Sequence, residues 1–344
     1  MWSIIVDNVP LFIALLVPVF FSFFTSTGWI GSFKKYFKRN NIIALDLHKK
    51  GKPRIPNSGG LPVSLSIMYG LLLFIGFQTF LFKTIDQEQL IYLLVSILSV
   101  ILISIIGFLD DLDNADVIAG KRKKRAGVKQ WLKPLATSIA AVPLMVVSAG
   151  ETTMTLPVLG PINFGLAYPI ILIPLTVVFI SNAINLLGGF NGSEAGMGIV
   201  YCSFLGLYAL LAGEIMAAAI FFSTLFALIG FLRFNWYPAQ ILPGDSLTYC
   251  LGAVVASGII IGNMERAGVI IMIPFIFEFI LKLISKFKAS CLGKLRKDGK
   301  LDPPYGKKIY SWTHVIMNLG KLTEKQVTLI LILIQIIFGL LIFL

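Results

Sequence analysis

Long apolar runs divide almost the whole chain, and their length limits what it can fold into. About ten runs are recognisable, most of them about 16–22 residues long, the length an α-helix needs to cross a hydrocarbon layer roughly 30 Å thick. They lie near 8–26, 61–82, 90–109, 131–149, 167–187, 195–212, 214–232, 247–262, 267–285 and 326–344. The sequence lacks the alternation of barrel strands, which leaves helices as the only spanning form. We expect an all-α integral membrane protein with about ten transmembrane helices.

The charged residues support this class and give an orientation. Only 13% of the residues are charged, about half the share found in soluble domains. If the helices alternate, all of the 29 Lys and Arg residues except Lys83, Arg266 and Lys282 fall on one side or at its boundary. Positively charged loops face the cytoplasm, so both termini are expected on the outer face. The net charge of +12 then reflects topology and contact with anionic lipids rather than nucleic-acid binding.

The chain is expected to form a single polytopic membrane domain over residues 1–344, without a soluble appendage. The predicted cytoplasmic loops, which we expect to form the functional site, are 27–60, 110–130, 188–194, 233–246 and 286–325. On the outer face, residues 150–165 alternate in polarity between turn residues, which predicts a small β-hairpin.

Conspicuous polar residues gather at the predicted cytoplasmic ends of the spans. These positions are Asp46, Lys49, Asp110, Asp111, Asn182, Asn185 and Asp245. Because the orientation rests on Lys and Arg alone, the co-location of these acids and amides is a separate observation. It predicts one site at the inner membrane surface.

The chemistry of these residues points to phosphate and a cation. Asp110 and Asp111 repel each other at a membrane boundary, so a divalent metal or a lysine must offset their charge. Asp245 follows a Pro-Gly turn and suits either a helix cap or a Mg²⁺ ligand. Asn182 and Asn185 share a helix face and suit metal, nucleobase or sugar contacts, or hydrogen bonds between helices. Without a nucleophilic Ser or Cys constellation, this set favours phosphoryl transfer on Mg²⁺.

Four segments resemble the polyprenyl-phosphate N-acetylhexosamine-1-phosphate transferases, which are membrane enzymes of ten helices. The segments are GFLDDLDN, NAINLLGGFNGSEAG, NWYPAQILPGDSLTY and LTEKQVTLILILIQIIFGLL. The likeness extends from about residue 46 to the carboxyl terminus. It is greatest to the eukaryotic and archaeal branch, which transfers N-acetylglucosamine-1-phosphate from UDP-N-acetylglucosamine to dolichyl phosphate.

This resemblance implies release of UMP in the first membrane step of lipid-linked glycan assembly, with Mg²⁺ or Mn²⁺ as cofactor. The implied partners are a UDP-sugar, a polyprenyl or dolichyl phosphate, membrane lipids and a second copy of the chain in a homodimer. The implied location is an archaeal type of cell membrane, with the active site facing the cytoplasm.

The resemblance also assigns roles to individual residues. Asn185 and Asp245 match the metal ligands. Asp110 and Asp111 match the paired catalytic acids near the metal and the acceptor phosphate. Either could orient or deprotonate the acceptor, with Asp111 favoured for deprotonation and Asp110 for the metal neighbourhood. Lys129 is expected to grip phosphate, with Lys133 as the alternative. The substrate-binding positions are Asp46, Leu47, Lys49, Asn114, Asn182, Gly189, Asn191, Glu194, Leu242, Lys288 and Arg296.

Two departures from the family pattern bear on specificity. Leu242 stands beside the expected uracil, where many relatives have an aromatic residue, and Asn191 is expected to read that base. The last cytoplasmic loop lacks the usual arginine- and histidine-containing run, and Lys288 and Arg296 are candidates in its place.

Two alternatives stay open from the sequence. One is a relative that uses another UDP-N-acetylhexosamine or a muramyl-peptide-like donor. The other is a transporter for a lipid-linked or anionic solute, which predicts acids near the bilayer midplane and broken helices in paired positions.

Overall fold

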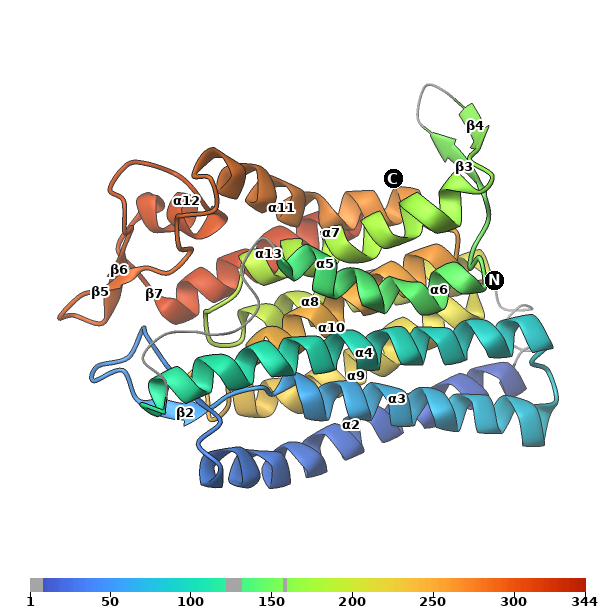
Figure 1. The fold of residues 1–344 in the computed structure, drawn as a ribbon, viewed down its shortest axis with the longest axis horizontal. Helices are drawn as coiled ribbons and strands as arrows, with labels where there is room; N and C mark the ends of the chain where they lie inside the picture. Colours follow the sequence, from blue (N-terminus) through green and yellow to red (C-terminus); the bar gives the residue numbers. More distant parts are fainter. Residues whose placement is uncertain (1–8, 122–131, 157–159) are drawn as a thin grey trace.

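The structure is a computed structural model that describes residues 9–121, 132–156 and 160–344. Figure 1 shows a bundle of long helices lying side by side, with strands and loops at its two ends. The long helices are α2 (Val9–Arg39), α3 (Gly60–Gly76), α4 (Gln87–Ile118), α7 (Ile173–Leu186), α8 (Ser193–Ala212), α9 (Ile215–Asn235), α10 (Gly244–Ile261), α11 (Glu265–Ile284) and α13 (Glu324–Leu341). Within the described residues, nine helical segments are long and apolar enough to cross a membrane. The predicted fold class is confirmed.

The run predicted over 131–149 differs from a single span. It contains three short pieces, α5 (Lys133–Ser138), the 3-10 turn η3 (Ile139–Ala141) and α6 (Val142–Val146). At 1.5 Å per residue, these pieces together extend roughly 21 Å, less than a hydrocarbon layer. Pro143 near the start of α6 lacks the N–H that would continue a regular helix. Two short segments are π-helical: η1 (Phe77–Phe82) adjoins α3, and η4 (Tyr168–Leu172) adjoins α7.

Asp110 and Asp111 lie inside helix α4, whereas the sequence predicted a membrane span that ends near residue 109. The helix begins at a capping box in which the Asp86 side chain accepts from the Gln89 N–H, and it continues to Ile118. Its 32 residues would extend roughly 48 Å. Asp110 and Asp111 therefore lie within the helix, beyond the roughly 20 residues that cross the hydrocarbon layer. The first part of the predicted cytoplasmic segment 110–130 is therefore a helical continuation of α4, up to Ile118.

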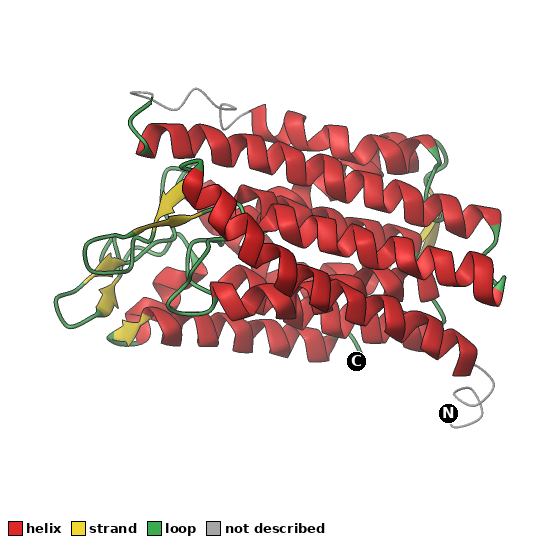
Figure 2. Ribbon diagram, turned by 90° about the horizontal axis from the view of Figure 1, so that it is seen from below, coloured by secondary structure: helices red, strands yellow, loops and turns green. Residues whose placement is uncertain are grey.

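The two ends of the bundle carry different structures. One end has the antiparallel pair β1 (Ile43–Leu45) and β2 (Arg54–Pro56), the sheet β5 (Lys294–Leu295), β6 (Lys300–Asp302) and β7 (Leu322–Thr323), and the helix α12 (Trp312–Leu319). The other end has the hairpin of β3 (Thr153–Leu156) and β4 (Gly160–Asn163), which projects from the bundle in Figure 1. Figure 2 shows most strands gathered in the loops at one end. The predicted hairpin within 150–165 is confirmed, and we call the opposite end the loop end.

Helix α10 lies at the centre of the bundle, and 89% of its apolar stretch is buried. It packs against α3, α4, α7 and α9. Glycines allow the closest of these approaches: a Cβ at Gly107 of α4 would lie 2.5 Å from the Asp245 carbonyl oxygen, and one at Gly252 would lie 2.2 Å from Ser181 Cα. This packing fixes where α10 begins, and Asp245 lies in its first turn.

Candidate active site

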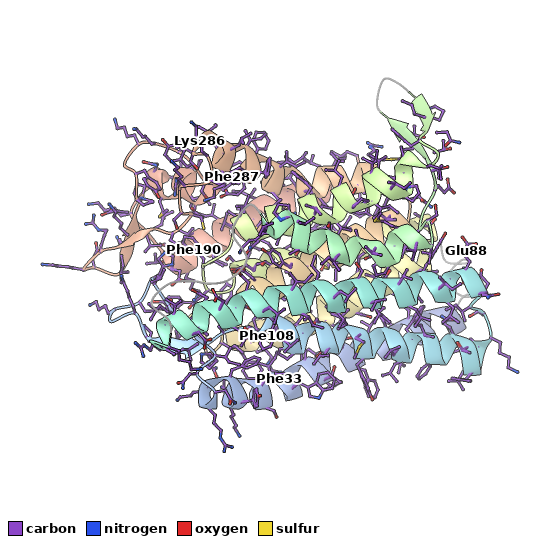
Figure 3. All side chains as sticks on the ribbon, in the orientation of Figure 1. Phe33, Glu88, Phe108, Phe190, Lys286 and Phe287 are labelled. Carbon is purple, nitrogen blue, oxygen red and sulfur yellow. The ribbon has the colours of Figure 1, made fainter. Side chains whose placement is uncertain are left out.

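A cavity of about 350 Å³ opens at the loop end and brings together segments far apart in the sequence. Its size suits a small-molecule ligand. The predicted site residues that line it are Asp46, Leu47, Asp111, Asn114, Asn185, Gly189, Asn191, Glu194, Leu242 and Asp245. Figure 3 places Phe190, another lining residue, at this end, and Glu88 at the opposite end.

Lys133 bridges Asp110 and Asp245 next to the cavity, and of these three residues only Asp245 lines it. The Lys133 Nζ donates to Asp110 Oδ2 and to Asp245 Oδ2, each at 2.9 Å. The Asp110 side chain is 4% exposed and that of Asp245 is 25% exposed, which leaves Asp245 the more accessible acid. Among the described residues, Lys133 therefore supplies a positive charge to Asp110 and Asp245. Lys129 lies outside the described residues.

Asp111 holds the beginning of α10. Its Oδ1 accepts from the backbone N–H of Asp245 at 2.8 Å, and its Oδ2 accepts from that of Ser246 at 3.2 Å. Asn57 Nδ2 donates to Oδ1 at 3.2 Å. A carboxylate facing the free N–H groups of a helix start interacts favourably with the helix dipole. Asp111 thus positions Asp245, a contribution that the predicted proton-transfer role did not include.

Asn185 and Asp245 meet the chemical requirements of a Mg²⁺ site. Both line the cavity, and the Thr248 hydroxyl lies within hydrogen-bond distance of Asn185 Oδ1, at 3.0 Å. Within the described residues, no group of three or more His, Cys, Asp or Glu side chains is placed to hold a metal. One carboxylate and one amide oxygen beside an open cavity still fit Mg²⁺, which takes its other ligands from water and substrate phosphates.

Asn182 lies outside this cavity, although it shares a helix with Asn185. Its Nδ2 donates to Thr137 Oγ1 at 3.1 Å and to the Val178 carbonyl oxygen at 2.8 Å. Thr137 belongs to α5, the helix that also carries Lys133. Asn182 therefore attaches α5 to α7 instead of facing the cavity.

The turn between α7 and α8 forms another wall of the cavity. Gly189 has a φ of 109°, a conformation that disfavours residues with a side chain. The Glu194 carboxylate accepts from the Gly189 N–H at 2.7 Å and from the Ser193 hydroxyl at 2.6 Å. Glu194 thus stabilises the turn on which Asn191 is carried. Asn114 faces the same cavity from α4, three residues beyond Asp111 and on the same face of the helix.

The predicted base-binding residues come from two other connections. Leu47 follows β1, and Leu242 lies between α9 and α10; the Leu242 N–H donates to the Pro56 carbonyl oxygen at 2.9 Å, which ties the two connections together. Lys49 Nζ donates to Asn191 Oδ1 at 2.9 Å, and it lies 3.4 Å from Asp46 Oδ2. These contacts place Asp46 and Lys49 at the same wall as Asn191.

The last loop reaches the cavity through different residues from those predicted. Leu292 lines it, and the Cys291 thiol donates to the Gly188 carbonyl oxygen at 2.9 Å; burial raises the pKa of this thiol to about 12. Lys288 is exposed. Arg296 pairs with Asp298 and Asp302 at 3.2 and 3.1 Å, and neither basic residue lines the cavity.

Sequence reasoning did not single out Asn57, Thr248 or Glu324. Asn57 donates to Asp111, Thr248 contacts Asn185, and Glu324 contacts Asn191 and Lys49. The sequence contained one signal for Thr248, because it lies three residues after Asp245 and therefore on the same helix face. The other two depend on contacts between distant segments.

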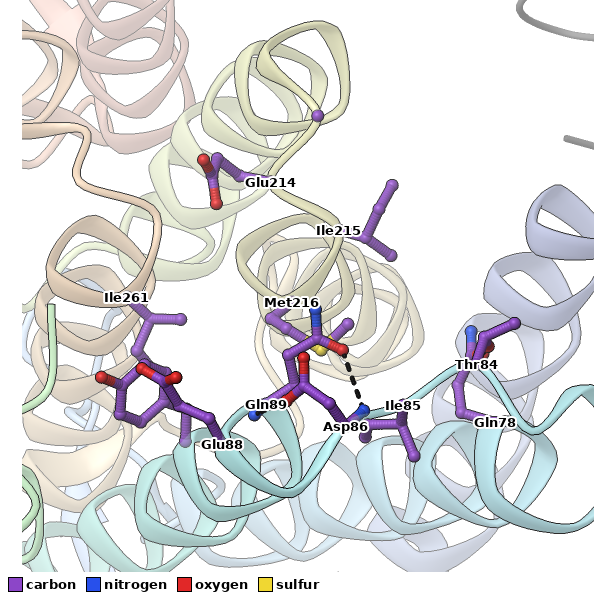
Figure 4. Close-up of a pocket in the computed structure, with 12 residues that line it drawn as sticks. Gln78, Thr84, Ile85, Asp86, Glu88, Gln89, Glu214, Ile215, Met216 and Ile261 are labelled. Atoms are coloured by element: carbon purple, nitrogen blue, oxygen red, sulfur yellow. Dashed lines mark hydrogen bonds between the residues drawn. The ribbon is translucent and has the colours of Figure 1, made fainter.

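A second cavity, of about 330 Å³, lies at the opposite end between α4 and the α8–α9 connection (Figure 4). Asp86, Glu88 and Glu214 line it, and the described residues of its lining include no Lys, Arg or His. The loop-end cavity also has acidic walls, but there Lys49 pairs with Asp46 and Lys133 pairs with Asp245, so that adjoining cations offset the negative charge that would repel phosphates. The loop-end cavity, which adjoins Lys133 and Lys49, is therefore the candidate active site.

The fold and this site define a multi-pass membrane protein with a cavity for an anionic ligand at one end of its bundle. A model of glycosyl transferase family 4 matches residues 93–263. A relative from Saccharolobus solfataricus is 36% identical over 93% of this chain and 92% of its own length. The chain belongs to this family of membrane glycosyl-phosphate transferases.

The names of the relatives specify substrates for those proteins. A Dictyostelium discoideum relative, 29% identical over 86% of this chain and 79% of its own, is named UDP-N-acetylglucosamine–dolichyl-phosphate N-acetylglucosaminephosphotransferase. The Saccharolobus relative has a provisional form of that name. A Geobacillus relative, 31% identical over 72% of this chain and 73% of its own, is named phospho-N-acetylmuramoyl-pentapeptide-transferase.

Proposed function

We propose that the chain transfers N-acetylglucosamine-1-phosphate from UDP-N-acetylglucosamine to a polyprenyl phosphate of the dolichyl type and releases UMP. The observation that carries this proposal is the loop-end cavity, in which Asp245, Asn185 and Asn191 face one space beside Lys133. Family membership and the names of the Saccharolobus and Dictyostelium relatives support the choice of donor and acceptor.

The reaction exchanges one phosphate bond for another. An oxygen of the lipid phosphate attacks the β-phosphorus of the donor, the bond between that phosphorus and the bridging oxygen breaks, and UMP leaves with the bridging oxygen. Positioning and charge neutralisation supply most of the catalysis in such transfers. The polyprenyl pyrophosphate sugar then stays in the membrane.

Different residues of the site provide metal binding, charge neutralisation and positioning. Asn185 and Asp245 would hold Mg²⁺, which neutralises the pyrophosphate charge when it is bound. Lys133 contributes a positive charge beside the reacting phosphates. Asp111 holds the α10 start, and Asp110 keeps Lys133 oriented. The sequence favoured Asp111 for deprotonation of the acceptor, whereas its contacts with the start of α10 support a positioning role.

The active site is proposed to face the cytoplasm. The loop end carries most of the Lys and Arg residues, which supports a cytoplasmic active site under the positive-inside rule. A cytoplasmic site also matches the location of nucleotide sugars. Homodimer formation stays a prediction.

The direct test incubates purified protein with polyprenyl phosphate, Mg²⁺ and a panel of UDP-sugars, with UMP release as the readout. UDP-N-acetylglucosamine is expected to be the best donor, and EDTA is expected to stop a reaction that Mg²⁺ or Mn²⁺ restores. Turnover only with a UDP-muramoyl-peptide would assign the chain to the activity named for the Geobacillus relative. UMP release that EDTA leaves unchanged would contradict the metal-dependent chemistry.

A further inference from the structure

Glu324 is a buried acid that the proposed chemistry does not use. It lies in the first turn of α13, and it is 2% exposed. An acid at this position commonly only complements the helix dipole at a solvated surface. Here Oε1 accepts from the backbone N–H of Asn191 at 2.8 Å, and Oε2 accepts from the Lys49 ammonium. One carboxylate therefore contacts both the first loop and the turn between α7 and α8.

These contacts fix which way the Asn191 amide points. Its Oδ1 accepts from Lys49 Nζ and from the Ala239 backbone N–H, both at 2.9 Å. Because both partners are donors, the amide oxygen must face them and cannot exchange places with the nitrogen. Among the described residues, the Nδ2 group donates to no protein acceptor, and Asn191 lines the cavity. The amide thus has a donor left for a ligand.

His48 extends the arrangement to the last loop. Its Nε2 accepts from the Gly293 backbone N–H at 3.1 Å. In the neutral ring the proton therefore resides on Nδ1, which lies 3.6 Å from Glu324 Oε1. The ring also packs on Phe190, with 4.5 Å between centroids. His48 thus brings the last loop next to the carboxylate that contacts the other two loops.

We propose that Glu324 is a positioning residue for nucleotide selection: through Lys49 and the Asn191 backbone it presents the Asn191 NH₂ group to the cavity. This rests on the proposed function, which makes a nucleotide the ligand. A donor at that place favours a base with a carbonyl oxygen at the edge it reads. Uracil has such an oxygen where cytosine has an amino group, itself a donor. The pocket should therefore prefer uridine to cytidine nucleotides.

Binding of UMP and of CMP to purified protein tests this role without requiring turnover. Glu324→Gln keeps the size of the side chain but removes the charge that holds Lys49. UMP affinity is expected to fall about tenfold, and CMP affinity to change less than about threefold. Glu265→Gln is the matched control, since Glu265 lies in the first turn of α11, away from the cavity lining. It should preserve both affinities.

A second variant keeps the test decisive if Glu324→Gln fails to fold. Lys49→Met leaves Glu324 in place and removes the donor to Asn191 Oδ1, so it should also narrow the preference for UMP over CMP. Thermal unfolding reports which variants are folded. A wild-type ratio of UMP to CMP affinity in the folded variants would overturn the role of Glu324. Wild-type protein that neither binds UMP nor releases it from a UDP-sugar would instead contradict the proposed function.

Discussion

At the scale of single residues, the centre of the site is an ammonium group shared by two carboxylates. Lys133 Nζ lies 2.9 Å from both Asp110 and Asp245. Removing one partner of a buried charge cluster leaves the others uncompensated, which is costly. Lys133 therefore contributes both to the folded site and to the field at the reacting phosphates.

Lys133→Met is expected to lower the rate of sugar-phosphate transfer about 10²–10³-fold, because it removes a charge positioned beside the transferring group. Initial rates of UMP release measure this effect. The control is Lys121→Met, which removes a lysine that pairs with Asp116 and is 57% exposed. Exposed pairs contribute little, so this control should transfer at the wild-type rate. Equal rates for both variants would exclude Lys133 from the reaction.

Two asparagines on one helix give a sharper comparison. Asn185→Ala removes an oxygen from the proposed Mg²⁺ site and should raise the Mg²⁺ concentration required for half-maximal activity. Asn182→Ala loses the bond to Thr137, which should lower the melting temperature modestly and leave the Mg²⁺ requirement unchanged. Titration of activity with Mg²⁺ measures both. A raised requirement in Asn182→Ala alone would reverse these roles.

The sequence predicted most of the cavity because charge bias and span ends together place residues on one membrane side. It could not separate Asn182 from Asn185, since both share a helix face and only the packing of α5 distinguishes them. The role of Glu324 could not be predicted either, because its partners, Lys49 and Asn191, are far away in the sequence. Arg296 lies outside the cavity lining, where the nearby Asp298 and Asp302 bind its guanidinium, and nothing in the sequence indicated these pairs.

At the scale of elements, the position of Asp245 depends on how closely α4 approaches α10. Gly107 permits this contact, because a Cβ there would meet the Asp245 carbonyl oxygen at 2.5 Å. Gly107→Ala should therefore reduce activity together with thermal stability, since backbone atoms must move. Gly31→Ala in α2 is the control, because a Cβ there meets nothing within 4 Å. Full activity in Gly107→Ala would show that the site tolerates movement of α10.

The last loop should respond to acid through His314. Burial lowers the pKa of His314 from 6.5 to about 4. Its Nδ1 accepts from the Tyr310 N–H at 3.1 Å, and its Nε2 lies 2.9 Å from the Ser290 carbonyl oxygen. The neutral ring satisfies both contacts, whereas protonation of Nδ1 would break the first.

The sign of this effect follows from the direction of the shift. The unfolded chain binds a proton below about pH 6.5 and the folded chain does not. The stabilisation is therefore complete above that pH and is lost progressively as the pH falls from 6.5 towards 4. The melting temperature of the wild type should fall more between pH 7 and pH 5 than that of His314→Gln. Parallel decreases in the two proteins would contradict this role.

At the scale of the whole molecule, the bundle separates two unlike ends. The loop end has the cavity, Lys133 and most of the basic residues, whereas the opposite end has an acidic cavity and the β3–β4 hairpin. A lipid phosphate at the membrane surface and a soluble nucleotide sugar can meet only at such an end. The described acids of the active site lie there too, which favours a transferase over a transporter with acids at the bilayer midplane.

The most direct measurement follows the β-phosphate of the donor. UDP-N-acetylglucosamine labelled with ³²P at that phosphate is incubated with polyprenyl phosphate, Mg²⁺ and purified protein, and the lipid and aqueous phases are counted. The wild type should move the label into the lipid and release unlabelled UMP, and a folded Asp245→Ala protein should leave the label in the donor. Label transfer by Asp245→Ala at the wild-type rate would contradict a reaction centred on the loop-end cavity.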